Sequence, residues 1–105
     1  MKKQTKQNQD LMFKECIDVM REPIAKLSEK YPLHIINSAL IELGLRMSMI
    51  EGGSYHTIRI FAGVMHNIST FGQLIEKDIA ETIRAGQKPD PFEDWEYSPT
   101  KKTLH

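Results

Sequence analysis

The apolar positions in the first third of the chain recur at helical spacing. Five of them follow one another at intervals of four, three, four and three residues, which places their side chains on one face of a helix. They are Phe13, Ile17, Met20, Ile24 and Leu27. Asp10 is a suitable N-cap and Tyr31-Pro32 cannot continue a helix, so the pattern predicts an amphipathic helix between these points.

Two irregularities are expected in this region. Residues 1–9 are polar, rich in Lys and Gln, and lack apolar periodicity, so they are predicted to form a flexible basic arm. Pro23 lies inside the helix, where it removes a backbone N–H donor and clashes with the preceding turn. We therefore expect the helix to kink or restart near Arg21 and Glu22.

The next two segments are apolar nearly all round. Residues 33–50 carry only two full charges, and residues 55–71 carry only one. Between them, Gly52 and Gly53 offer the left-handed conformation that ends a helix, and Ser54 can cap the next one. This order predicts a long apolar helical hairpin that turns over residues 51–54.

A third helical pattern precedes the end of the chain. It is an ordinary amphipathic stripe with a spacing of four residues, formed by Ile75, Ile79 and Ile83. Gly86 is a stop signal, and the two prolines that follow prevent the helix from continuing. Whether residues 69–72 interrupt the helix stays open. The predicted organisation is a flexible basic arm, one helical domain and an acidic aromatic tail, at residues 1–9, 10–86 and 87–105.

The apolar hairpin constrains the fold class. A helix in a small bundle normally has one apolar stripe and one polar, solvent-exposed face. Residues 33–50 have too few polar side chains to form such a polar face. Either the other helices and the tail wrap this segment, or a second copy of the chain covers it. We favour the second copy, because a symmetric dimer is the commonest way to bury such a surface. The prediction is an all-α small helical bundle, completed by homo-oligomerisation.

The composition limits the expected partners and the expected cellular compartment. The chain has 105 residues, which leaves room for one core, and its 14 basic and 14 acidic residues give a net charge of zero. Neutrality removes any general attraction to nucleic acid or to anionic membranes, so neither is an expected partner. A single cysteine cannot form an internal disulfide, and no secretory signal pattern is recognised, so we expect a cytoplasmic protein.

A membrane-spanning hairpin is the alternative explanation for the two apolar segments. Each apolar segment approaches the ~18–20 residues that span a bilayer. However, Glu42, Arg46 and Arg59 lie inside these segments, and each charge at a helix centre costs at least about 2.5 kcal/mol in lipid. We therefore expect no membrane association.

The same three charged residues form the first candidate site. In an antiparallel hairpin centred on Gly52-Gly53, Arg59 would lie opposite Arg46 and one turn from Glu42. Paired guanidinium groups in an apolar layer can hold a carboxylate or phosphate. We favour the alternative, an ion-pair network in which Glu42 bridges both arginines at the hairpin or oligomer interface.

No pattern points to catalysis, a metal or a cofactor. The four histidines have no second ligand at the i,i+3 or i,i+4 spacing that puts two ligands on one helix face; they are His34, His56, His66 and His105. Cys16 has no histidine in local reach and is predicted to be a small buried apolar side chain rather than a nucleophile. We expect a protein that is not an enzyme.

The tail is the second candidate site. It interleaves three aromatic residues with three acids, namely Phe92, Glu93, Asp94, Trp95, Glu96 and Tyr97. Aromatic anchors flanked by acids are typical of a segment that docks onto a partner protein with a basic rim. The equally weighted alternative is that the aromatic side chains cover the chain's own helices.

The sequence thus favours a small cytoplasmic, self-associating interaction protein. It would bind another macromolecule, a protein whose identity the pattern does not give, through the tail or through the rim of a dimeric bundle. The alternative is a small regulator associated with nucleic acid, in which the dimer presents two Lys-rich arms formed by Lys2, Lys3 and Lys6.

Overall fold

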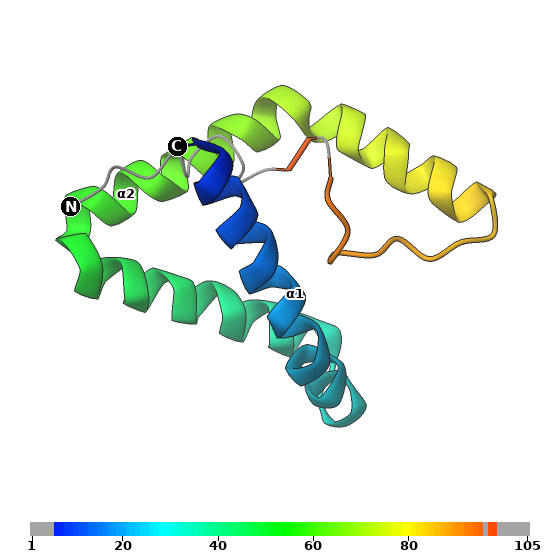
Figure 1. The fold of residues 1–105 in the computed structure, drawn as a ribbon, viewed down its shortest axis with the longest axis horizontal. Coiled ribbons are helices and arrows are strands. Elements are labelled where there is room, and N and C mark those ends of the chain that lie inside the picture. Colours follow the sequence, from blue (N-terminus) through cyan, green and yellow to red (C-terminus); the bar gives the residue numbers. More distant parts are fainter. Residues whose placement is uncertain (1–5, 96, 99–105) are drawn as a thin grey trace.

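The computed structural model describes residues 6–95, 97 and 98, and this part of the chain consists of two helices without strands. Helix α1 spans Lys6–Lys30 and helix α2 spans Leu33–Arg84. The predicted all-α class is confirmed. Figure 1 shows a sharply bent α2, with α1 joined to the start of its first half and the segment after α2 running back toward α1.

Helix α1 begins earlier than predicted and is not interrupted. It starts at Lys6 rather than at Asp10, so residues 6–9 are helical and that part of the predicted flexible arm is wrong; residues 1–5 lie outside the described residues. Unbranched polar residues such as Lys and Gln have favourable helix propensities, so an existing helix extends into them at little cost in free energy. The expected restart near Pro23 does not occur. Because Pro23 and Val19 are exposed, water can bind the carbonyl that the proline leaves without a donor.

Helix α2 is bent at one residue. Gly53 has φ 81° and ψ −171°, a combination that is accessible essentially only to glycine. The bend separates a proximal arm, residues 33–52, from a distal arm, residues 54–84. It lies where the sequence predicts the turn, but the two arms diverge from it (Figure 1), so a close-packed hairpin is not confirmed.

Side chains at the bend explain why two glycines are needed there. Thr57 is buried and its Oγ1 donates a hydrogen bond of 2.9 Å to the carbonyl oxygen of Gly53. His56 Nε2 lies 2.8 Å from Glu51 Oε1. A Cβ on Gly52 would lie only 2.5 Å from His56 Cγ. Gly52 therefore allows the close approach of a side chain, whereas Gly53 supplies the backbone conformation.

The far end of α2 has the predicted glycine stop. Gly86 has φ 81°, its N–H donates to Ile83 O at 3.0 Å, and the N–H of Gln87 donates to Thr82 O at 3.1 Å. These two bonds form a Schellman motif, which satisfies carbonyls that the helix end would leave open. The helix runs unbroken through residues 69–72, which settles the question that the sequence left open.

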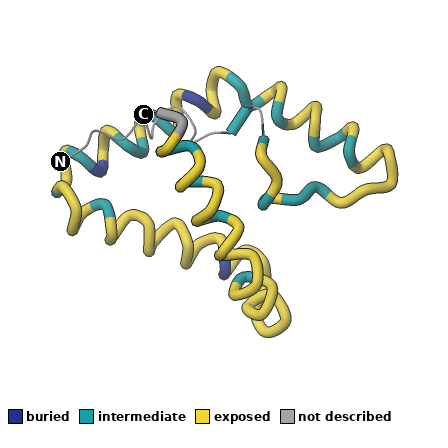
Figure 2. The backbone as a smooth tube through the Cα atoms, in the orientation of Figure 1, coloured by how far each residue is buried: buried dark blue, intermediate teal, exposed yellow. Residues whose placement is uncertain are grey.

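Little of the described chain is buried. Only Ile36, Thr57 and Asn67 are buried, and most residues of α2 are exposed (Figure 2). Most of the large apolar residues of α2 are among those exposed. Helix α2 also contains a stretch that is long and apolar enough to cross a membrane, with a mean hydropathy of 1.2 and 6% of its residues buried. A single chain therefore leaves α2 largely uncovered.

The bend yields a direct test. Replacing Gly53 by Ala should destabilise the fold by about 1–3 kcal/mol, because a Cβ is strained at this φ and ψ. The matched control is Gly44→Ala, which adds a methyl group to open space in the proximal arm and should stabilise the helix by about 0.5–1 kcal/mol. Urea unfolding followed by circular dichroism measures both changes. Equal effects of the two substitutions would contradict the role assigned to Gly53.

Candidate functional site

The tail packs against the chain's own helices. Its described residues, 87–95, 97 and 98, return from the end of α2 toward α1 (Figure 1). Phe92, Trp95 and Tyr97 are each half-buried. Of the two roles that the sequence left open for these aromatic residues, the geometry supports the covering role, and docking onto an outside partner stays a prediction. Glu96 lies outside the described residues.

Asp90 organises the tail and joins it to α1. Its Oδ1 accepts a hydrogen bond of 2.9 Å from the Phe92 backbone N–H, and its carbonyl oxygen accepts one of 2.9 Å from Trp95 Nε1. Its Oδ2 lies 3.2 Å from Nη1 of Arg21 on α1. The Phe92 N–H, with a smaller contribution from the Arg21 guanidinium, holds the pKa of the Asp90 carboxyl below its ordinary value despite opposing desolvation.

Aromatic contacts extend this attachment to both helices. The guanidinium of Arg21 also lies over the Phe92 ring, with Cζ 4.7 Å from the ring centroid, so one arginine makes an ion pair and a cation–π contact. Farther along the tail, Tyr97 stacks on Phe71 of α2 with ring centroids 5.4 Å apart. The tail thus links the middle of α1 to the distal arm of α2. We call this set of contacts the tail clasp.

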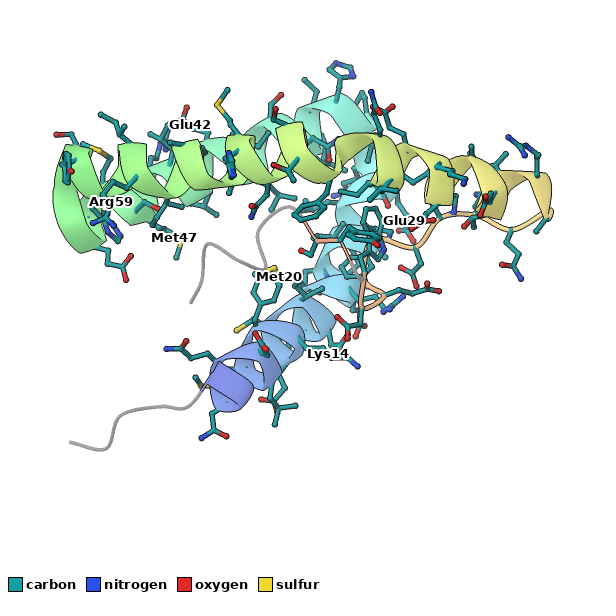
Figure 3. All side chains as sticks on the ribbon, turned by 90° about the horizontal axis from the view of Figure 1, so that it is seen from above. Lys14, Met20, Glu29, Glu42, Met47 and Arg59 are labelled. Carbon is teal, nitrogen blue, oxygen red and sulfur yellow. The ribbon has the colours of Figure 1, made fainter. Side chains whose placement is uncertain are left out.

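A cavity of about 520 Å³ lies between α1 and the tail. Phe13 and Ile17 of the predicted apolar stripe line it on the α1 side, and Phe92 and Trp95 line it on the tail side. Lys14 also lines it, and Figure 3 shows this side chain on α1 near the returning tail. A cavity of about 270 Å³ on the α2 side shares Trp95. The tail therefore faces the first part of the α1 stripe, whereas Met20 and Leu27 farther along it stay exposed.

The predicted layer of three charges is only partly present. Arg46 Nε lies 3.0 Å from Glu42 Oε2, which is an exposed pair one turn apart on the proximal arm. Arg59 lies instead over the Tyr55 ring, with Cζ 6.0 Å from the centroid. In Figure 3, Glu42 and Arg59 lie along opposite edges of the bent helix. The described contacts therefore do not bring the three together, because the divergent arms do not follow the antiparallel register that the prediction assumed.

The histidines and the cysteine do not form a cluster within the described residues. Within the described residues, no group of three His, Cys, Asp or Glu side chains could hold a metal ion. His56 contacts Glu51 at the bend, and His105 lies outside the described residues. Cys16 is exposed, so the prediction that it is buried is wrong. It lies beside the stripe of α1 that faces the tail, and not on it.

The sequence interpretation missed the residues that hold the tail. These residues are Arg21, which the sequence places only near the expected kink, Asp90 and Phe71. One signal was available for Arg21, which lies four residues after Ile17 and three before Ile24, on the stripe that the tail covers. Nothing local indicated that Asp90 would be its partner, 69 residues away.

Three comparisons with known proteins were made for this chain. No family model matches it, and neither the curated proteins nor the solved structures searched give a significant match. Its function is therefore argued from its own geometry.

The clasp predicts an effect of Arg21→Ala. Losing the cation–π contact should destabilise the tail by about 0.5–1 kcal/mol, because the Arg21 side chain is half exposed, and the exposed ion pair with Asp90 adds little to this. Trp95 is the only tryptophan, so its fluorescence should shift to longer wavelength as the tail detaches. The control is Lys26→Ala, which removes an exposed pair with Glu22 and should change stability by no more than about 0.5 kcal/mol. An unchanged Trp95 spectrum in Arg21→Ala would contradict the clasp.

The low pKa of Asp90 predicts an acid-sensitive tail. Because the ionised carboxyl is favoured in the folded chain, its contribution is complete above the ordinary pKa of 3.8 and is lost as the pH falls through the lower folded value. Trp95 fluorescence should therefore report tail detachment in acid below pH 3.8. Asp90→Asn should remove this dependence. Identical acid titrations of the two proteins would show that another group controls the transition.

Proposed function

We propose that the protein is a small cytoplasmic interaction protein that assembles with a second copy through α2 and presents the rim of the resulting bundle to another macromolecule. One observation carries the proposal: α2 exposes most of its large apolar side chains. Those of the proximal arm that are more than half exposed are Leu33, Ile41, Leu43, Met47 and Ile50. Tyr55, Ile58 and Met65 add to this surface on the distal arm.

The energetic argument concerns the area that these side chains leave in water. Removing apolar surface from water contributes roughly 25 cal/mol per Å², and soluble monomers rarely expose large contiguous apolar patches. A second copy offers the same surface, so a two-fold arrangement covers both at once. Because both arms expose apolar side chains, an arm of the second copy could pack along each of them. In this arrangement the predicted bundle is completed between chains rather than within one.

Charge favours a protein over a bilayer as the cover. Glu42 and Arg46 form an exposed ion pair in the middle of the proximal arm, and Arg59 lies in the distal arm. Each such charge costs about 2.5–3.5 kcal/mol at the centre of a membrane. At the edge of a helical interface the same groups can stay in contact with water.

The clasp bears on how the outside partner would bind. Phe92 and Trp95 cannot anchor a partner while they line the cavity against α1, so tail binding would first require the clasp to open. The bundle rim needs no such opening and is the favoured partner surface. No described contact favours the nucleic-acid alternative.

The test compares the same substitution on two surfaces. Ile41→Glu places a charge on the proximal arm, where the side chain is 62% exposed, and Val19→Glu does the same on α1, where it is 76% exposed. Light scattering should give a dimer mass for the wild-type chain and for Val19→Glu. Ile41→Glu should raise the dissociation constant by roughly 10- to 100-fold, as expected for losing about 1.5–3 kcal/mol of apolar burial.

Two outcomes would overturn the proposal. A wild-type monomer at all concentrations would remove self-association. Flotation of the wild-type chain with neutral phosphatidylcholine vesicles, abolished by Ile41→Glu, would instead identify a lipid surface as the cover of α2.

A further inference from the structure

We infer that the tail clasp is exchanged between the two copies of the dimer, so that the tail of each chain closes over α1 of the other. This inference rests on the proposed self-association and adds the residues that the second copy contributes. Asp90, Phe92 and Trp95 of one chain would then contact Arg21, Phe13 and Ile17 of its partner. The cavity between α1 and the tail would be an intermolecular site.

The first argument is that the clasp joins units with few other links. Helices α1 and α2 share little direct contact, and the chain between them is only Tyr31-Pro32. The Arg21–Asp90 ion pair and the Arg21–Phe92 ring contact, which join the tail to α1, are made by side chains. Such contacts form equally well with α1 of another copy, so the exchange loses none of them.

The second argument concerns the linker. The tail turns back only after Gly86, whose positive φ ends α2. Pro89 and Pro91 flank Asp90, and each proline fixes its own φ and biases the preceding residue toward an extended backbone. Once the backbone opens at residues 87–88, the extended linker can carry the tail to another chain, where the Tyr97 ring would stack on Phe71 of that chain instead of its own. Segments joined by stiff, short hinges are the ones that exchange at low cost.

The third argument is the balance between the closed monomer and the exchanged dimer. Closing the clasp within one chain partly covers Phe13 and Ile17 of α1 but leaves α2 exposed. Exchange keeps the α1 cover and holds two α2 helices together through two clasps, so that burial of α2 offsets the entropy lost on association. Each clasp then also raises the effective concentration of the apolar surfaces.

The experiment places one cysteine on each side of the cavity. Lys14 and Glu93 both line it, from α1 and from the tail, and both are exposed. In the full chain with Cys16→Ser, the variant Lys14→Cys/Glu93→Cys is treated with a short bismaleimide. An exchanged clasp produces a covalent dimer on a denaturing gel, whereas a clasp closed within one chain produces an internally linked monomer. The two single-cysteine variants are the controls for links between like positions.

A second measurement guards against a variant with altered folding. Lys14→Cys and Glu93→Cys chains, both with Cys16→Ser, are unfolded together, refolded and cross-linked. A linked heterodimer supports exchange, and its absence, with helix content unchanged by circular dichroism, overturns it. Light scattering separates this result from the proposed function: a dimer with only internal links overturns the exchange alone, whereas a monomer overturns self-association and the exchange with it.

Discussion

The structure depends on one imbalance: helix α2 carries far more apolar surface than the rest of the chain can cover. A chain of 105 residues has room for one core, yet the described residues bury only Ile36 among the large apolar side chains. The bend at Gly53 makes the imbalance larger, because divergent arms cannot cover each other. What remains exposed is a long helix whose apolar side chains are stabilised by contact with another apolar surface.

The tail clasp covers a small part of the exposed apolar surface through polar and aromatic contacts. In place of an aliphatic core between helices, the contacts are an arginine shared between a carboxylate and a ring, an indole N–H bonded to a backbone carbonyl, and two stacked aromatic rings. Each of these contacts is directional and half-exposed, so the tail is held in a defined place without deep burial. Phe13 and Ile17 of α1 are partly covered in this way, and most large apolar side chains of α2 are not.

The clasp and the exposed helix are therefore connected features. If α2 assembles with a second copy, α1 and the tail of one chain can come within reach of those of its partner, and the side of α1 that faces the tail becomes available for exchange. Under this arrangement the acidic aromatic segment contributes to assembly. The bundle rim, with its exposed Glu42–Arg46 pair, is left as the polar surface on which specificity for another macromolecule can rest.

The sequence by itself determined the local features. The end of α1 before Pro32, the bend at the glycine pair and the stop at Gly86 all follow from backbone preferences of single residues, which act whatever the rest of the chain does. The apolar character of α2 followed equally from its composition. The start of α1 was misjudged because a helix extends into polar residues at almost no cost.

Only the tertiary structure decided which distant side chains meet. The pairing of Arg21 with Asp90 and of Phe71 with Tyr97 depends on how far the tail returns, and no local preference fixes that path. Within one chain the described contacts do not bring Glu42, Arg46 and Arg59 together, for a related reason. The turn at Gly53 was predictable, but the angle between the arms was not, because it is set by one unusual pair of backbone angles and by the contacts of Thr57 and His56 around it.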